Sequence, residues 1–550
     1  MEYTIMTPAQ VWQDFNTEEK LDIVKNDETT ENHCAYLVVT VTALKTEQGL
    51  LRAVLEIYKP LDKPSDKAVI IVQEYAQRAQ RDIVYDLVSK GYTVIIPDCS
   101  GIGENYRTEF PVGLEYGDIS KAGDHIKKVC PTAKDTCQYL YTAIVRRAAT
   151  FVIRELKISD IAVIGIGDGV EVAMQAAGCD HRFKALVCVN GAGYKEYLHI
   201  NKYGDKRELE IDEQMMCWLT GVASVAYAKH ISAPVMIAIP SNSDKADIDR
   251  LSNLLALLGD NHVSIVITPN SRSSVSQAAY QTIAKWLKGA LSGKKLLKRP
   301  KTVLSVSDGV VYAEAQADRT KDIKDVYIYY SYGEYDHLVR NWKRADSVAI
   351  SKTQFIAKLK IDQNKGPLFA FCDIIYKEGF CLSSAETYAL LEDLDFKPDV
   401  EDSGRIVYEG SMGVASFIEE SDKPILLKSG LTQAVTPIGL KGVKSEFGRL
   451  LNFDIGRYAR QNKGKILQID VYSDKDITLK IKLTVKGSKG KVEEYEAVSP
   501  MKASSGAFVS HKFEANDFKN SKLFSLEDWD SVKAICILNN DAIIGKILFI

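Results

Sequence analysis

The sequence Gly-Ile-Gly-Asp-Gly at residues 165–169 is the pattern in this chain whose residue types and spacing point most directly to chemistry. It follows an apolar, β-branched run at 161–164 and precedes residues 170–177, whose composition favours a helix. A strand, a tight turn and a helix make a nucleophile elbow when a serine stands between the two outer glycines. Here Gly167 occupies the serine position. The turn therefore has the frame of an acyl-transfer site without an atom that could attack a substrate.

A serine or cysteine nucleophile also needs a histidine that accepts its proton and a carboxylate that orients this histidine. Asp244 and Asp247 follow the strand-like run 235–239 and are the candidates for the carboxylate. The histidine is expected after the next strand-like run, but residues 269–274 read Pro-Asn-Ser-Arg-Ser-Ser. Because the nucleophile and the base are both missing, we predict a site that has lost its catalytic activity.

The first half of the chain alternates strand-like and helical segments, which predicts a mostly parallel, doubly wound sheet with helices on both faces. The strand-like runs are 36–43, 50–58, 68–72, 93–97, 161–165, 185–189, 235–239 and 263–268, and the helical patterns are 81–90, 135–156, 170–177, 248–258 and 275–291. The first two runs have no helix between them and predict an antiparallel hairpin at the edge of the sheet.

Residues 1–292 resemble the α/β-hydrolases, in particular the branch of dienelactone hydrolases and acetylxylan esterases. The motifs that carry the resemblance follow one another along the chain. They are the strand 68–72, the Asp-x-x-Gly-x-Gly turn 98–103, the long helix 135–156, the elbow, the strand before the acid at 231–238, the strand 263–268 and Trp286 in the last helix. The resemblance implies an α/β-hydrolase-like fold and, if the site is active, hydrolysis of carboxylic esters.

In such a fold the loop after the strand 68–72 supplies donors to the oxyanion. Here this loop reads Gln73-Glu74-Tyr75 and lacks the glycines that are typical of it. These three residues are instead candidates for contacting a ligand.

A relocated active site is the alternative for the same edge of the sheet. Cys99 follows a neighbouring strand-like run, and Asp168 lies on the elbow itself. His199 and His230 fall in the segment between the sixth and seventh strands, which covers the site in this family. A cysteine at a strand end is more often structural than reactive, so relocation is the weaker hypothesis.

The elbow also matches most of the Gly-x-Gly-x-x-Gly fingerprint of dinucleotide sites. Val170 replaces the third glycine, and the next strand ends at 189–191 without an acidic residue for a ribose. No cysteine or histidine pair has zinc spacing. We therefore expect no cofactor and no metal, while binding of an anion at the glycine-rich start of the helix stays open.

After a basic linker at 293–302 the helical patterns stop. Short strands at 303–397 predict a small β-sandwich like an immunoglobulin or fibronectin type III domain, with Trp342 in its core. The strand-rich segment 398–550 resembles galactose-binding-like and carbohydrate-binding jelly-roll sandwiches. Trp529 is the candidate aromatic platform for a sugar there, and a place in the core is its alternative role.

Composition limits the class of partner and compartment. The net charge of −3 gives no electrostatic reason to expect nucleic acid or an anionic membrane. We find no apolar run of about 18 residues and no evident signal peptide. The ten cysteines are scattered, several within apolar runs, which favours a reducing compartment and hence the cytoplasm.

The sequence thus predicts three domains, of which the first is a degenerate hydrolase. The leading hypothesis is a non-catalytic pseudo-esterase that acts in binding or assembly. Its expected partner is a carbohydrate or small acyl ligand, and a homo-oligomer stays open. One alternative is an active esterase or deacetylase on acylated carbohydrate that uses Cys99 or another group in place of the serine. The other is a structural, self-assembling protein.

Overall fold

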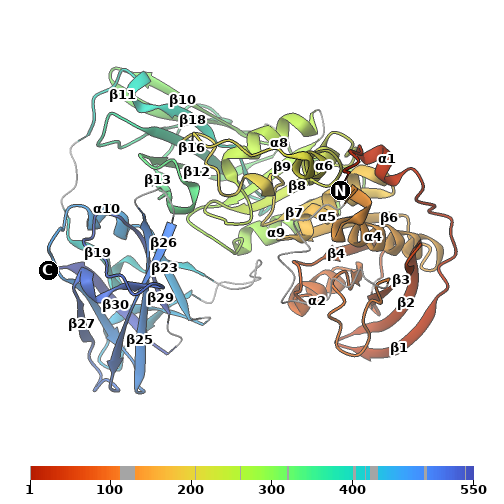
Figure 1. Cartoon of the computed structure of the whole chain (residues 1–550). Helices are drawn as coiled ribbons and strands as arrows, with labels where there is room; N and C mark the ends of the chain where they lie inside the picture. Colours follow the sequence, from red (N-terminus) through yellow and green to blue (C-terminus); the bar gives the residue numbers. More distant parts are fainter. Residues whose placement is uncertain are drawn as a thin grey trace.

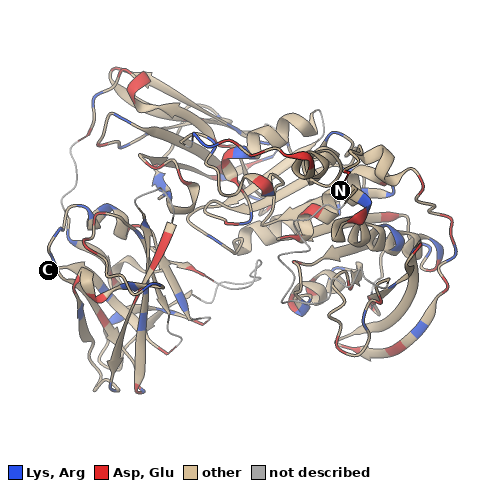
Figure 2. Cartoon of the chain, in the orientation of Figure 1, with Lys and Arg blue, Asp and Glu red and all other residues tan. Residues whose placement is uncertain are grey.

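A computed structural model describes residues 2–62, 64–111, 131–204, 206–259, 262–318, 321–399, 404–414, 416–420, 431–446, 448–487, 492–538 and 541–550. An α/β part is followed along the chain by two parts made of antiparallel sheets (Figure 1). In the portion of the chain that is described, no helix is both long enough and apolar enough to cross a bilayer. Acidic and basic side chains are interspersed over these three parts (Figure 2).

The α/β part is built on a nine-stranded sheet with the order β1-β2-β3-β5-β4-β6-β7-β8-β9. Its strands are β1 (Val24–Glu31), β2 (Cys34–Thr46), β3 (Gly49–Pro60), β4 (Lys67–Val72), β5 (Thr93–Pro97), β6 (Asp160–Ile166), β7 (Phe183–Val189), β8 (Val235–Pro240) and β9 (Val263–Thr268). Pairing is antiparallel from β1 to β5 and parallel from β5 through β4 to β9. The predicted doubly wound, mostly parallel sheet is confirmed. The β2–β3 hairpin is not at the edge, because β1 pairs outside it.

Helices cover both faces of this sheet. They are α1 (Pro8–Trp12), α2 (Arg81–Ser89), α4 (Cys137–Arg154), α5 (Gly169–Cys179), α6 (Glu213–Gly221), α7 (Ser224–Ala228), α8 (Leu251–Leu258) and α9 (Gln277–Ala290). Buried side chains of α4, α5 and α8 share one core with alternate residues of the parallel strands, and α2 and α9 share the core on the opposite face. The strands are apolar on both faces because both are covered.

The middle part is a pair of sheets. One holds β10 (Lys301–Ser307), β11 (Val310–Gln316), β14 (Val348–Ala349) and β15 (Gln354–Lys358); the other holds β12 (Ile323–Tyr332), β13 (Lys343–Ala345), β16 (Pro367–Tyr376), β17 (Cys381–Ser383) and β18 (Thr387–Leu390). Trp342 is 3% exposed and meets Phe371 edge-on at 4.8 Å between ring centroids, in a core shared with the α/β part.

The C-terminal part has two six-stranded sheets and the short helix α10 (Ile455–Ala459). The first contains β19 (Ile406–Glu409), β21 (Leu431–Val435), β22 (Lys441–Ser445), β24 (Leu467–Tyr472), β27 (Val509–Phe513) and β30 (Ile543–Phe549). The second contains β20 (Ile418–Glu419), β23 (Arg449–Asn452), β25 (Ile477–Lys486), β26 (Val492–Met501), β28 (Lys519–Asn520) and β29 (Val532–Leu538). A single apolar core contains residues from both sheets.

Candidate functional site

The elbow lies between β6 and α5, where the sequence places it. Gly167 has a φ of +55°, and its N–H donates to the carbonyl of Val189 at 2.9 Å. A Cβ on Gly165 would lie 2.5 Å from the Cα of Val170, and one on Gly169 would lie 2.3 Å from the carbonyl oxygen of Val72. The outer glycines are therefore required by the close packing of helix against strands. This also explains how Val170 fits where a dinucleotide fingerprint has a third glycine.

The space that a nucleophile would need is filled. A Cβ built on Gly167 would lie 2.8 Å from Oε2 and 2.9 Å from Cδ of Glu74. Glu74 comes from the loop after β4, where the sequence analysis placed a ligand contact. Its side chain instead lies over the apex of the elbow.

Four charged side chains join at this edge in an alternating chain. Oε1 of Glu74 lies 3.0 Å from Nζ of Lys245, which lies 3.4 Å from Oδ2 of Asp168. The other oxygen of Asp168 accepts a hydrogen bond of 2.5 Å from Lys195. Two carboxylates thus face two ammonium groups, and the elbow carries a neutral ion-pair network.

This network sets the protonation of Asp168 and Lys245. Burial alone would raise the pKa of Asp168, but Lys195 and Lys245 outweigh it, so the pKa lies below its usual value. Burial would lower the pKa of Lys245, whereas Asp168 and Glu74 raise it to about 12. Both groups are charged at neutral pH, so Asp168 has no tendency to act as a general acid there.

The candidate oxyanion loop also lines a small pocket of about 30 Å³ beside the elbow. Gln73 and Tyr75 line it together with Cys99, and the ring of Tyr75 lies 6.2 Å from that of Tyr141. Burial, with Asp98 beside it, raises the pKa of the Cys99 thiol well above its ordinary value. A thiol held in the neutral form is a poor nucleophile, so the structure disfavours a Cys99-based active site.

Neither histidine from the relocation hypothesis supports a catalytic pair. His230 follows α7 and precedes β8, which places it at the amino-terminal edge of the sheet, opposite the elbow. His199 is an exposed residue after β7, and its carbonyl accepts a hydrogen bond from Arg207.

The loop after β9, where a catalytic histidine is expected, binds the two β-sheet parts. The side-chain amide of Asn270 donates to the backbone carbonyl of Trp342 at 2.9 Å. Its oxygen accepts a hydrogen bond from the backbone N–H of Trp342 at 2.7 Å. Arg272 donates to the Thr484 hydroxyl, and the Ser274 hydroxyl donates to the carbonyl of Glu419 at 3.4 Å. This loop therefore holds the domains together.

The loop after β8 is used in a similar way. Asp244 is exposed, whereas Asp247 is buried and pairs with Arg250 at 3.0 Å. The amide of Asn242 donates to the carbonyls of His337 and Arg340 in the middle part, at 2.8 and 2.7 Å.

A histidine that the sequence analysis did not consider lies next to Asp247. Nδ1 of His337 is 4.0 Å from Oδ1 of Asp247, and Nε2 is 2.9 Å from the carbonyl oxygen of Ser243. Because a carbonyl can only accept, this ring nitrogen carries the proton and does not activate a hydroxyl. The Ser243 hydroxyl donates elsewhere, to Asn190 at 2.6 Å.

Asp247, Asp249 and His337 are close enough together to ligate a metal ion. However, the buried guanidinium of Arg340 already donates to both oxygens of Asp249, at 2.7 and 3.0 Å, and to Glu386 at 2.9 Å. Arg340 supplies the positive charge that these carboxylates need.

A cleft of about 490 Å³ lies over the same edge of the sheet. Glu74, Asp244 and Lys245 line it from the α/β part, while Arg449 and Lys482 line it from the C-terminal part. The carboxyl-terminal edge of the parallel strands is thus partly covered by the C-terminal part.

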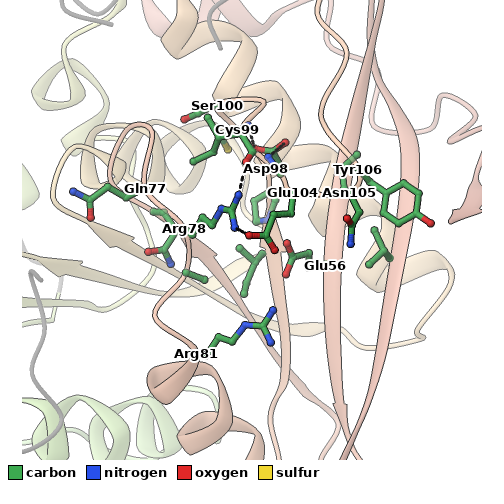
Figure 3. Close-up of a pocket in the computed structure, with 18 of the residues that line it drawn as sticks. Glu56, Gln77, Arg78, Arg81, Asp98, Cys99, Ser100, Glu104, Asn105 and Tyr106 are labelled. Atoms are coloured by element: carbon green, nitrogen blue, oxygen red, sulfur yellow. Dashed lines mark hydrogen bonds and ion pairs between the residues drawn. The ribbon is translucent and has the colours of Figure 1, made fainter. Parts of the chain in front are cut away.

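A second cavity, of about 200 Å³, opens beside the Asp98 turn (Figure 3). Asp98 organises that turn by accepting from the N–H groups of Ile102, Gly103 and Thr108. Figure 3 shows Arg78 paired with Glu104 above Glu56 and Arg81. The cavity offers donors and acceptors side by side.

Trp529 does not have the predicted sugar-binding role. Its ring is 1% exposed, its Nε1 donates to the carbonyl of Lys465 at 2.8 Å, and Phe518 and Phe549 pack against it edge-on. The platform hypothesis is wrong because no face of the ring is accessible. The alternative, a place in the core, is confirmed.

No protein-family model and no curated protein sequence matches this chain. Among solved structures, an acetyl xylan esterase from Paenibacillus sp. R4 is 16% identical, with a TM-score of 0.39, over 53% of this chain and 96% of that one. Acetyl xylan esterase 1 from Thermoanaerobacterium sp. JW/SL YS485 is 13% identical, with a TM-score of 0.38, over 52% and 94%. A putative dienelactone hydrolase from Klebsiella pneumoniae is 15% identical, with a TM-score of 0.29, over 49% and 96%. Each of these structures matches about half of this chain and nearly all of its own length.

Proposed function

We propose that this protein is a non-catalytic pseudo-esterase, in which a hydrolase scaffold serves binding and the assembly of three domains. The observation that carries the proposal is the Glu74 carboxylate within 2.8 Å of the position that a Gly167 Cβ would take. A nucleophile at the elbow would displace a residue that is ion-paired to Lys245.

The use of the neighbouring loops supports the same proposal. Asn242 and Asn270, which follow the strands that carry the acid and the histidine in active relatives of the fold, bind the middle domain instead. A loop that must hold another domain is not free to position a base for catalysis.

The test is hydrolysis of p-nitrophenyl acetate and of acetylated xylan by the full-length protein. We expect no turnover above that of a protein blank. The matched variant is Cys99→Ala, which removes the strongest alternative nucleophile. Turnover that is present in the wild type and absent in Cys99→Ala would overturn the proposal in favour of an active esterase.

For the ligand, we propose that the cavity in Figure 3 receives one neutral sugar ring. Its volume of about 200 Å³ exceeds the ~150 Å³ of a cavity that holds a six-membered benzene ring. Burial raises the pKa of Glu56, whose carboxylate accepts a hydrogen bond of 2.9 Å from Tyr58. Because sugar hydroxyls both donate and accept, they match a wall that combines Glu56 with Arg78 and Arg81.

Saturation-transfer NMR with xylose and glucose tests this ligand class. We expect transfer to ring protons that falls in Arg81→Gln, and unchanged transfer in Lys294→Met, an exposed lysine outside the cavity. Equal transfer in all three proteins would contradict the site.

The proposed compartment is the cytoplasm. Nine cysteines in the described residues are unpaired, and seven of these are buried, which supports a reducing environment. Cys130 lies outside the described residues.

A further inference from the structure

A small, strongly basic cavity lies where the middle domain meets the C-terminal domain, far along the chain from the elbow. It has a volume of about 50 Å³ and is lined by Lys343 next to Tyr332 and Asp362, and by Arg457 and Arg460. Lys343 is the first residue of β13. Arg457 lies within α10, and Arg460 directly follows this helix. β13 and α10 face each other across the junction (Figure 1).

The carboxylates around this cavity leave an excess of positive charge. Glu334 is held between Lys486 at 2.8 Å and Lys533. Asp362 accepts a hydrogen bond of 2.9 Å from the Tyr332 hydroxyl.

Three cations remain on the other walls. Nζ of Lys343 donates to the same Tyr332 hydroxyl at 2.6 Å. Arg457 and Asp454 interact electrostatically. Arg460 is exposed, and no described residue forms an ion pair or side-chain hydrogen bond with it. Within the described part of the chain, five cations thus surround three carboxylates, an excess of two positive charges.

We propose that this cavity binds a tetrahedral oxyanion, the chemistry of a phosphate group, between Lys343 of the middle domain and Arg460 of the C-terminal domain. The size fits, because each water-sized group needs about 10–15 Å³, and about 50 Å³ therefore accepts the four oxygens of such an ion. Guanidinium groups present paired donors that match phosphate oxygens, and an ammonium adds a point charge.

The electrostatic state of Lys343 agrees with an anion site. Burial, together with the charges of Arg457 and Arg460, lowers the pKa of Lys343 to about 8, even though Asp362 and Asp454 oppose this. A bound anion would compensate these charges. It would also connect two domains, so the anion stabilises their contact by the linkage between binding and folding.

The test is isothermal titration of the full-length protein with inorganic phosphate, with sodium chloride added to keep ionic strength constant. We expect binding that weakens about 10-fold or more in Lys343→Met and in Arg460→Gln, since a charge-assisted hydrogen bond is lost in each. Lys294→Met makes the same change of charge outside the cavity and should leave the dissociation constant within about twofold, because salt screens distant surface charges.

Thermal unfolding gives an independent readout. Phosphate should raise the melting temperature of the wild type more than chloride at equal ionic strength, and Arg460→Gln, which changes an exposed side chain, should abolish the difference. Glycerol phosphate distinguishes a free ion from the phosphate group of a larger molecule, because tighter binding than that of inorganic phosphate identifies the latter. A shift that chloride reproduces, or one that survives both substitutions, would overturn the proposal.

Discussion

Replacing Gly167 by serine restores the missing hydroxyl and tests how far the elbow has diverged from a catalytic one. Two structural costs follow. A side chain at a φ of +55° costs ~1–2 kcal/mol. The new Cβ must also displace the Glu74 carboxylate, which lies 2.8 Å away and is 3.0 Å from Lys245. Losing a partly exposed ion pair of this kind costs ~1 kcal/mol or less. The total destabilisation is therefore about 1–3 kcal/mol.

The second cost can be isolated with two further variants. Gly293 has a φ of +62°, and nothing lies within 4 Å of the position that a Cβ would take there, so Gly293→Ser measures the backbone term alone. Glu74→Ala removes the clash, so Gly167→Ser should be about 1 kcal/mol less costly in that background, a coupling within the usual range for contacting residues.

The assay is the shift in denaturation midpoint of each protein, combined with hydrolysis of p-nitrophenyl acetate. We expect no hydrolysis by Gly167→Ser, because the loop at 269–274 carries no histidine to accept the serine proton. The reasoning is refuted if Gly167→Ser is no more destabilising than Gly293→Ser, if the Glu74→Ala background gives no relief, or if esterase activity is restored.

Three further predictions concern polar side chains and the contacts they make. Arg340→Met should destabilise the protein by ~3–5 kcal/mol, seen as a lower denaturation midpoint, because it leaves Asp249 and Glu386 buried without their cation; a neutral effect would contradict this. Burial and the nearby Glu196 raise the pKa of Glu171 from about 4.5 to about 7, so the folded protein binds the proton more tightly and loses stability as the pH rises through this window. Glu171→Gln should remove that part of the loss between pH 5 and pH 8, whereas an unchanged pH dependence would rule it out. Asn270→Gly keeps the φ of +55° but loses both hydrogen bonds to Trp342, and should lower the midpoint by ~1–3 kcal/mol; an unaltered midpoint would show that this contact does not hold the domains.

The parallel strands were predictable because their signal is local. The runs 93–97 and 263–268 coincide with β5 and β9, since strands buried on both faces are continuously apolar. β1 was missed for the opposite reason: its sequence Val-Lys-Asn-Asp-Glu-Thr-Thr-Glu is polar and mostly exposed, and only its pairing with β2 makes it a strand. The strands β13, β14 and β17 were missed because each is only two or three residues long, which is too short for an alternating pattern to be recognised.

The sequence shows that the elbow lacks a nucleophile, but it does not show that the Glu74 side chain fills the vacant space. Gly167 and the loop without histidine can be read directly from the chain. The approach of Glu74 to Lys245 joins two loops that are far apart in sequence, and no local pattern reports that distance. Lys245 follows Asp244 directly in the loop after β8, and its positive charge was a signal that the sequence did offer.

The role of Asp247 shows the same limit. Its position after β8 suggested a catalytic acid, yet its neighbour His337 comes from another domain. Likewise, tryptophan is a residue type that stacks on sugars, and only the burial of Trp529 against Phe518 and Phe549 excludes that role. Residue type predicted what these side chains could do, and packing decided what they contact.

Intact-protein mass spectrometry after incubation with p-nitrophenyl acetate, and separately with a fluorophosphonate that labels serine hydrolases, tests the loss of catalysis most directly. We predict unmodified protein of 61.1 kDa in both reactions. A stoichiometric acetyl or phosphonyl adduct on one residue of the α/β domain would show that a nucleophile is activated there and would contradict the account.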